Sequence, residues 1–268
     1  MIPYEKKERY TVEDLMEIVS LLRSENGCPW DKVQTHQSIR TDLIEETYEV
    51  IEAIDQDDPA MLREELGDLL LQVAFHTSIE EERQRFTRED VYTEICEKLI
   101  TRHPHVFSTV QADTTEEVLT NWDAIKEASK HQTTRTQTVE AVPKTFPALM
   151  RGQKTFKRAV KGDTCMQDTL SGDFLVTACK EALAQLNFEE MLEKTAGEQM
   201  GYLLFCLAAL SHKLGISAEQ ALTDTTNRFV DLFAKAEASC LSEGKALTQC
   251  TEADWAAFWQ QFQKKEED

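Results

Sequence analysis

The chain has 268 residues and a formal net charge of −20, and its length suits one large domain or two small ones. Its negative field repels duplex DNA and anionic membranes, so we expect neither a nucleic-acid polymer nor a membrane as a partner. There is no apolar run near the roughly 20 residues that span a bilayer, no apolar signal region at the start and no C-x-x-C pair among the seven cysteines, so we expect a cytoplasmic protein with reduced thiols.

Helical patterns dominate the first 130 residues. Strand-like alternation is absent over any useful length, and the prolines fall at expected element boundaries. Thr11 is a suitable N-cap for the first helix, and Thr87 with Asp90 forms a capping box at the start of the fourth. The sequence therefore predicts an all-α fold, and its first five helices are expected at about 11–23, 35–56, 59–82, 87–102 and 114–130.

A polar segment follows at residues 131–147. It is rich in Thr and Gln and contains two prolines, a composition typical of a linker. Beyond it the apolar periodicity predicts further helices near 148–160, 173–187, 188–214, 217–239 and 251–264.

The two halves of the chain look like a diverged repeat. The segment 65–71 matches 199–205 in its apolar pattern, and 45–49 then falls on 180–184. The apolar positions persist in the second copy, but most of the acidic ones do not. We therefore expect two helical-bundle repeats, at 1–130 and 148–268, joined by the linker at 131–147.

Two short acidic motifs lie on the second and third predicted helices: Glu46-x-x-Glu49 and Glu65-x-x-Asp68. On a helical wheel each motif lies along the edge of an apolar stripe, and the short connection near Pro59 makes the two helices antiparallel neighbours. Four carboxylates that meet beside an apolar wall need a compensating charge. A magnesium ion supplies that charge, because it prefers oxygen ligands and completes its shell with water and phosphate.

A solvated acidic face is the simpler explanation for either motif alone. The pairing of the motifs favours a metal site, and so does Gly67, which costs about 1 kcal/mol in a helix and which we interpret as permitting close helix approach. The residue patterns that other metal or phosphate sites require are absent from the sequence. No histidine follows a glutamate at di-iron spacing, no histidine is followed by aspartate, and no Gly-rich phosphate loop is present.

Five motifs in a fixed order give the chain a resemblance to a known family. They are CPWDK at 28–32, EETYE at 45–49, ELGDLL at 65–70, RHPHVF at 102–107 and W-x-x-I-K at 122–126. Together they resemble the MazG nucleoside triphosphate pyrophosphohydrolases. The weaker match of the second half extends the resemblance to the two-domain members, so the all-α fold is expected to consist of two MazG-like repeats.

The resemblance implies an Mg²⁺-dependent enzyme that converts an NTP or dNTP to the monophosphate and pyrophosphate, with Mn²⁺ as a substitute metal. It also implies a homodimer in which helices from two subunits complete each site. The family's metal ligands map onto Glu46, Glu49, Glu65 and Asp68. The alternative is a helical module that senses nucleotides or binds a protein partner without catalysis.

The second copy departs from the family pattern. Ala184, Gln199 and Tyr202 stand at three of the expected ligand positions, and Glu181 alone keeps a carboxylate. We therefore expect residues 148–268 to form a degenerate, non-catalytic domain.

The remaining motif residues receive roles as hypotheses. Trp30 and Trp122 suit stacking on a base, with ordinary core packing as the alternative. Either Glu45 or Glu46 orients or deprotonates the attacking water, and the sequence leaves open which. Four cations in the acidic half suit phosphate oxygens; they are Lys32, Lys98, Arg102 and Lys126.

Overall fold

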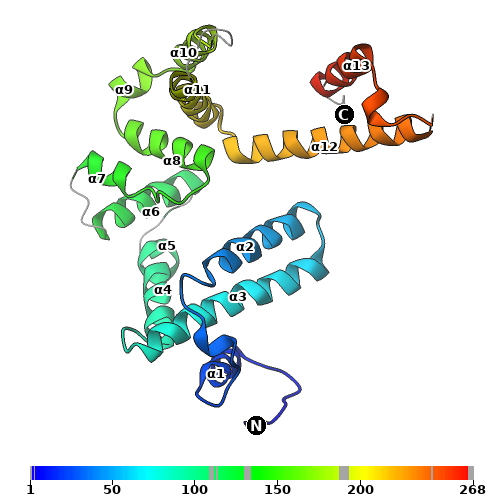
Figure 1. The fold of residues 1–268 in the computed structure, drawn as a ribbon. Helices are drawn as coiled ribbons and strands as arrows, with labels where there is room; N and C mark the ends of the chain where they lie inside the picture. Colours follow the sequence, from blue (N-terminus) through cyan, green and yellow to red (C-terminus); the bar gives the residue numbers. More distant parts are fainter. Residues whose placement is uncertain are drawn as a thin grey trace. The chain divides into compact units, whose positions relative to one another are not determined.

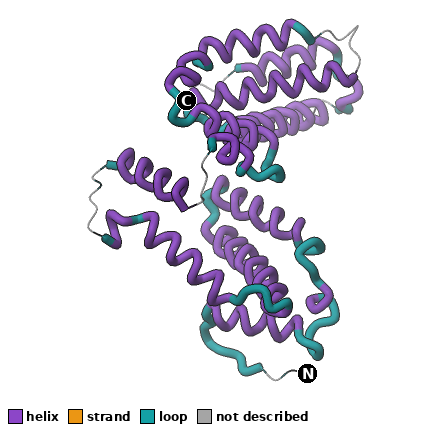
Figure 2. The backbone as a smooth tube through the Cα atoms, turned by 90° about the vertical axis from the view of Figure 1, so that its left-hand side faces the viewer, coloured by secondary structure: helices purple, strands orange, loops and turns teal. Residues whose placement is uncertain are grey.

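The fold is helical throughout the part of the chain that the structure describes, namely residues 2, 4–108, 112, 114–129, 134–186, 193–242 and 244–264. This computed structural model contains no strand within those residues (Figure 1 and Figure 2). The all-α prediction is therefore confirmed. The elements of the first part are α1 (Val12–Arg23), η1 (Asp31–Val33), α2 (Arg40–Asp55), α3 (Pro59–Glu82), α4 (Arg88–Arg102), α5 (Pro104–Phe107) and α6 (Thr115–Ser129).

The chain divides into two compact units, Met1–Ser129 and Lys130–Asp268. The elements of the second unit are α7 (Arg135–Glu140), α8 (Ala148–Val160), α9 (Thr164–Thr169), α10 (Gly172–Ala184), α11 (Glu193–Leu214), α12 (Ala218–Ser242), η2 (Leu247–Gln249) and α13 (Glu252–Gln263).

An antiparallel hairpin of α2 and α3 forms the centre of the first unit, with α1 packed against α3 (Figure 1). The apolar faces of these helices and the residue before α2 exclude water from one continuous core. The buried residues of that core are Met16, Val19, Ile39, Ala74, Phe75 and Ile79.

The turn between α2 and α3 follows directly from its sequence. Asp57 adopts a left-handed backbone with φ of 52°, and Asp58 Oδ1 accepts hydrogen bonds from the backbone N–H groups of Ala60 at 2.9 Å and Met61 at 3.1 Å. Pro59 occupies the first turn of α3, where its missing N–H has no helical partner to lose. The predicted bounds of α3 are confirmed.

The start of α2 differs from the prediction. The helix begins at Arg40 rather than near residue 35. The backbone N–H of Thr35 donates to Ser38 Oγ at 2.8 Å, and the N–H of Ser38 donates to Thr35 Oγ1 at 3.2 Å. Such local side-chain bonds compete with the helical ladder, so a turn precedes α2.

The second unit repeats the order of packing found in the first. α10 and α11 form a hairpin and α8 packs against α11, as α1 packs against α3. The buried core here consists of Phe156, Val160, Leu175 and Ala209. The predicted helix start at 188 lies outside the described residues, and the domain bounds at 1–130, 131–147 and 148–268 stay a prediction.

Composition did not predict the short helices α7 and α9. α7 lies within the segment expected as a linker, and it begins with a capping box at Thr134. Arg158 Nη1 donates to the carbonyl oxygen of Thr138 at 2.8 Å, and Arg135 forms an ion pair with Asp163 at 2.7 Å. These contacts attach α7 to α8 and to the start of α9. The composition of the segment does not reveal this attachment.

Among the described residues, no single helix has the length and apolar character needed to cross a membrane. Residues 194–214 and 218–242 meet that test only when taken together, with a bend of 104° between them.

A core substitution tests the packing of the first unit. Met16 is 2% exposed, so Met16→Ala leaves a cavity and lowers the free energy of unfolding by about 2–5 kcal/mol. Urea denaturation measures the change. The matched control is Val106→Ala, since Val106 is 63% exposed and its truncation alters stability by no more than about 0.5 kcal/mol. Equal losses in the two variants would contradict this core.

Candidate active site

The structure brings three of the predicted ligands together across the α2–α3 hairpin. One carboxylate oxygen from each of Glu46, Glu49 and Glu65 lies within 4.8 Å of the other two. Glu46 and Glu65 are half-buried, and Glu49 is exposed. No other cluster of three acidic, histidine or cysteine side chains within the described residues has this geometry.

The electrostatics of the hairpin place Asp68 close to the same cluster. Burial raises the pKa of Glu46, and the charges of Asp68, Glu49 and Glu65 raise it further. Burial also raises the pKa of Glu65, with further contributions from Glu49, Glu64 and Asp68. Within the part of the chain that the structure describes, none of these ligand carboxylates has a basic partner. We name Glu46, Glu49, Glu65 and Asp68 the acidic set.

This donor chemistry fits a hard divalent cation. Carboxylate oxygens are the ligands that Mg²⁺ accepts, and a cation would relieve the repulsion that raises the pKa of Glu46 and Glu65. Glu45 precedes Glu46 on α2 and is exposed. Its position leaves its carboxylate accessible to water without placing it in the cluster of three.

The interpretation of Gly67 is wrong within this chain. A Cβ added to Gly67 would meet no atom within 4 Å, so no neighbouring helix in the described part of the first unit makes use of the missing side chain. Leu66 beside it is 49% exposed. This face of α3 is open to solvent.

The Trp30 loop is held by a buried arginine that the sequence analysis did not identify. Arg23 Nη1 donates to the carbonyl oxygen of Asp31 at 2.7 Å, and its Nε and Nη2 atoms donate to the carboxylate of Glu82 at 2.7 and 2.9 Å. Trp30 itself is 60% exposed, so core packing does not explain it. Lys32 is exposed, and its Nζ lies 3.4 Å from the carbonyl oxygen of Glu25.

A second group of predicted residues meets where α4 and α6 pack together. The Arg102 guanidinium lies 5.4 Å from the ring centroid of Trp122, and the ring of His103 meets Trp122 edge-on at 4.9 Å. Lys98 is exposed one turn before Arg102, and Lys126 lies one turn after Trp122. No ion pair among the described residues joins Lys98 or Arg102 to the acidic set, so the structure does not unite the two groups.

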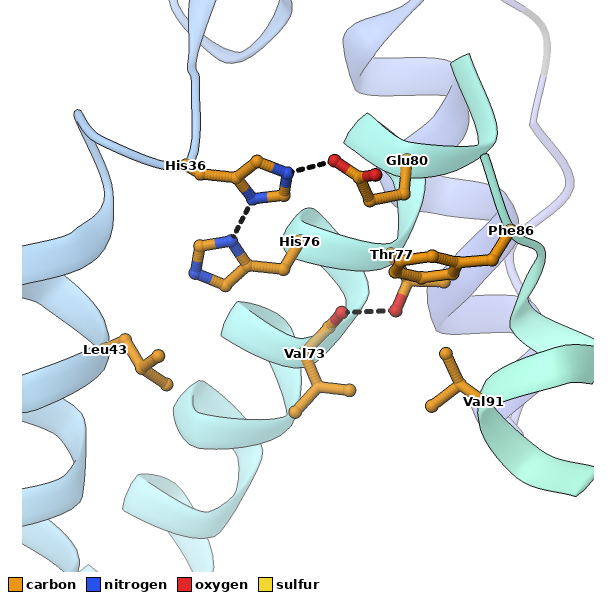
Figure 3. A pocket seen from close by; sticks show the side chains of 8 residues that line it. All are labelled: His36, Leu43, Val73, His76, Thr77, Glu80, Phe86 and Val91. Carbon is orange, nitrogen blue, oxygen red and sulfur yellow. Dashed lines mark hydrogen bonds and ion pairs between the residues drawn. The ribbon is translucent and has the colours of Figure 1, made fainter. Parts of the chain in front are cut away.

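A pocket of about 350 Å³ lies on the same hairpin, between α2, α3 and the start of α4 (Figure 3). Leu43 lines it one turn before Glu46 on α2, and Val73 lines it from α3. At one end His36 Nδ1 lies 2.7 Å from His76 Nδ1. The other His36 nitrogen, Nε2, contacts the carboxylate of Glu80, as Figure 3 shows.

The sequence did not predict the histidine pair, because the histidines were compared only with the short local patterns Glu-x-x-His and His-Asp. His36 lies in the loop before α2, and His76 is 40 positions away on α3. Burial lowers the pKa of His76, and the charge of His36 lowers it further. A local motif search has no means of detecting such a pair.

The second unit keeps the hairpin without the acidic set. Glu181 lies on α10, whereas Gln199 and Tyr202 lie on α11. A hydrogen bond with Cys206 raises the pKa of the Tyr202 hydroxyl. Uncharged groups thus occupy three of the four positions where the first unit has carboxylates.

The ion pairs of Glu80 predict a stability change in acid. Hydrogen bonds from Arg85 and then His36 hold its pKa at about 2, against an ordinary value of 4.5. The ionised carboxylate therefore stabilises the fold above pH 4.5, and this contribution is lost as the pH falls from 4.5 to about 2. In urea denaturation, wild type should lose stability through this window more steeply than Glu80→Gln. Parallel pH profiles for the two proteins would contradict the pairing, and Glu94→Gln, an exposed change on α4, should follow wild type.

The acidic set predicts an opposite effect at neutral pH. A raised pKa means that folded Glu46 holds its proton more tightly than the unfolded chain does, so stability falls as the pH rises through 4.5 and remains lower at pH 7. In metal-free buffer, Glu46→Gln should therefore have a higher Tm than wild type by calorimetry. Glu52→Gln, an exposed change on the same helix, should leave Tm unchanged. A lower Tm for Glu46→Gln would show that its charge is compensated in the folded chain.

Comparison with known proteins relates most of the chain to one family. Residues 34–107 match the MazG nucleotide pyrophosphohydrolase domain. The nucleoside triphosphate pyrophosphohydrolase of Escherichia coli (strain K12) is 36% identical over 261 residues, which cover 96% of this chain and 98% of that protein. The nucleoside triphosphate pyrophosphohydrolase/pyrophosphatase MazG of Thermotoga maritima is 37% identical over 248 residues, covering 92% and 94%.

A further relative is longer than this chain. The uncharacterized protein YabN of Bacillus subtilis (strain 168) is 37% identical over 249 residues, but these cover 93% of this chain and 51% of YabN. The chain therefore spans about half the length of that relative. The near-complete matches in both directions to the E. coli and T. maritima proteins nevertheless show that the chain belongs to the MazG family of nucleotide pyrophosphohydrolases.

Proposed function

We propose that this chain hydrolyses nucleoside triphosphates, NTP or dNTP, to the nucleoside monophosphate and pyrophosphate. The observation that carries the proposal is the convergence of Glu46, Glu49 and Glu65 without basic partners among the described residues. The E. coli and T. maritima relatives are named for this activity, which supports the same reaction here. We place the enzyme in the cytoplasm, with neither a membrane nor a nucleic-acid polymer as partner.

The acidic set is the proposed holder of Mg²⁺. When bound, the ion would supply positive charge that offsets the negative charge developing on the departing pyrophosphate. Mn²⁺ is a suitable substitute because it accepts the same carboxylate oxygens. Glu45 or Glu46 then orients or deprotonates the attacking water, and the exposed position of Glu45 suits that role without a ligand function.

The aromatic and basic residues are the proposed substrate contacts. Trp30 offers an exposed ring for stacking on a base, and the Trp122 ring lies beside the Arg102 guanidinium. The cations proposed to pair with phosphate oxygens are Lys32, Lys98, Arg102 and Lys126.

A homodimer would account for two further features of the first unit. Apolar side chains remain exposed along its hairpin and on α4, and no helix among the described residues of this unit covers Gly67. A second copy on this face would bury those side chains and bring cations toward the acidic set, which the single chain does not do. These exposed apolar residues are Ile44, Tyr48 and Ile51 on α2, Leu66 and Leu70 on α3, and Ile95 and Leu99 on α4.

The second unit is proposed to be a degenerate, non-catalytic repeat. Its hairpin of α10 and α11 retains the packing of the first, with one carboxylate at the four aligned positions. Its persistence without the acidic set indicates that the hairpin does not need these carboxylates in order to fold.

Substitutions in the full chain test the proposed reaction. Glu46→Gln and Asp68→Asn should each reduce Mg²⁺-dependent release of pyrophosphate by roughly 100-fold or more, because each removes a charged ligand. The matched control is Glu181→Gln at the position aligned with Glu46, which should keep the wild-type rate. The assay measures pyrophosphate from a panel of NTPs and dNTPs, and removal of metal by a chelator should abolish the release.

Thermal shift with Mg²⁺ separates the enzyme from a module that only binds nucleotides. Mg²⁺ and a nucleotide should raise the Tm of wild type but not of Asp68→Asn, because only ligand bound to the folded state stabilises it. A wild-type shift without any pyrophosphate release would identify the non-catalytic module. Unchanged release in both ligand variants would refute the acidic set as the active site.

A further inference from the structure

Two cysteine thiols meet in the second unit, which does not contain the acidic set. Cys240 Sγ lies 3.1 Å from Cys250 Sγ. Both residues are half-buried, and both thiols are free. The distance is that of a direct sulfur contact, so little movement separates the pair from a covalent bond.

The local fold holds this contact between the ends of two helices. Cys240 lies in the last turn of α12, and the backbone N–H of Lys245 donates to its carbonyl oxygen at 2.9 Å. Gly244 takes a left-handed conformation with φ of 71°, which turns the chain back. Cys250 directly precedes Thr251, whose capping box with Asp254 begins α13.

Aromatic packing fixes the two helices against each other. Phe229 and Phe233 of α12 contact Phe258 of α13 at ring-centroid distances of 5.4 and 6.2 Å. Trp255 stacks on Phe233 at 6.0 Å. Because these rings set the spacing of α12 and α13, the meeting of the sulfurs is a property of the hairpin and not of a mobile tail.

A cavity of about 490 Å³ gives small molecules access to both sulfurs. Cys240 and Cys250 line it, together with Lys235, Lys245 and Asp254. The Cys240 sulfur, through a hydrogen bond, raises the pKa of Cys250 to about 11, so Cys250 keeps its proton at neutral pH. A thiol that keeps its proton is a poor nucleophile, so the first attack falls to Cys240.

We propose that Cys240 and Cys250 are a thiol modification site that reacts with low-molecular-weight disulfides to form an intrachain disulfide. The Cys240 thiolate attacks one sulfur of the reagent, the reagent's S–S bond breaks, and one thiolate leaves and takes up a proton. Cys250 then loses its proton and attacks Cys240 Sγ, which expels the second reagent thiolate. Two protein thiols are oxidised, and one disulfide is reduced to two thiols.

The new bond would join the end of α12 to the start of α13. It closes a short loop that contains η2, and a cross-link of this kind lowers the conformational entropy of the unfolded chain. The oxidised protein should therefore unfold at a higher temperature than the reduced protein, by roughly 5 °C or more for the second unit.

Mass spectrometry of the full chain tests the site. The protein is treated with glutathione disulfide, its remaining thiols are alkylated, and it is digested with trypsin. Cleavage after Lys245 places the two cysteines on separate peptides, 236–245 and 246–264. We expect these peptides to be recovered as one linked pair, and the bond to disappear on reduction.

Single substitutions separate the two steps. Cys250→Ser should accumulate a mixed disulfide with glutathione on Cys240, because the second thiol is missing. Cys240→Ser should form no intrachain disulfide, because the partner thiol of Cys250 is missing. The matched control is Cys96→Ser, which removes an exposed cysteine and should form the Cys240–Cys250 pair at the wild-type rate. The proposal is overturned if the linked pair is absent while Cys96 and Cys165 become glutathionylated, or if the disulfides that form join different chains.

Discussion

Uncompensated negative charge across the α2–α3 hairpin is the constraint on which the candidate site depends. Glu46, Glu49 and Glu65 approach one another closely enough to share one cation, and burial raises the pKa of two of them. The packing of α2 against α3 holds these carboxylates close together. Farther along α3, Phe75 and Ile79 are buried against α1 and anchor the hairpin to the core.

The hairpin separates two tasks along its length. Toward the α2–α3 turn it presents the acidic set. Toward the other end of α3, the carboxylate of Glu80 is paired with His36 and Arg85. Glu80, which has partners, has a lowered pKa and contributes stability. Glu65 lies on the same helix and has no basic partner among the described residues; its pKa is raised, and its carboxylate remains available to a cation. Charge pairing therefore distinguishes the structural acids from the candidate functional ones on a single helix.

Local signals explain what the sequence could predict. Capping residues and Pro59 determined the starts of α1, α3 and α4, and helical periodicity placed Glu46 and Glu65 on facing edges. Contacts between distant residues were out of reach: the His36–His76 pair, the packing of α7 on α8 and the hydrogen bonds of Arg23 all depend on tertiary structure. The role assigned to Gly67 was wrong within this chain, because the presence of a glycine in the sequence does not reveal whether another helix packs against it.

The buried Arg23 has a consequence for where the working part of this protein begins. It lies at the end of α1 and contributes nothing to the acidic set, yet its guanidinium connects the loop of Trp30 and Lys32 to Glu82 at the end of α3. The N-terminal helix therefore serves as a brace for the surface loop that follows it. A shortened version that started at Ser24 would keep every proposed metal ligand and the proposed base-stacking ring of Trp30, but it would lose the arginine that supports the loop of that ring.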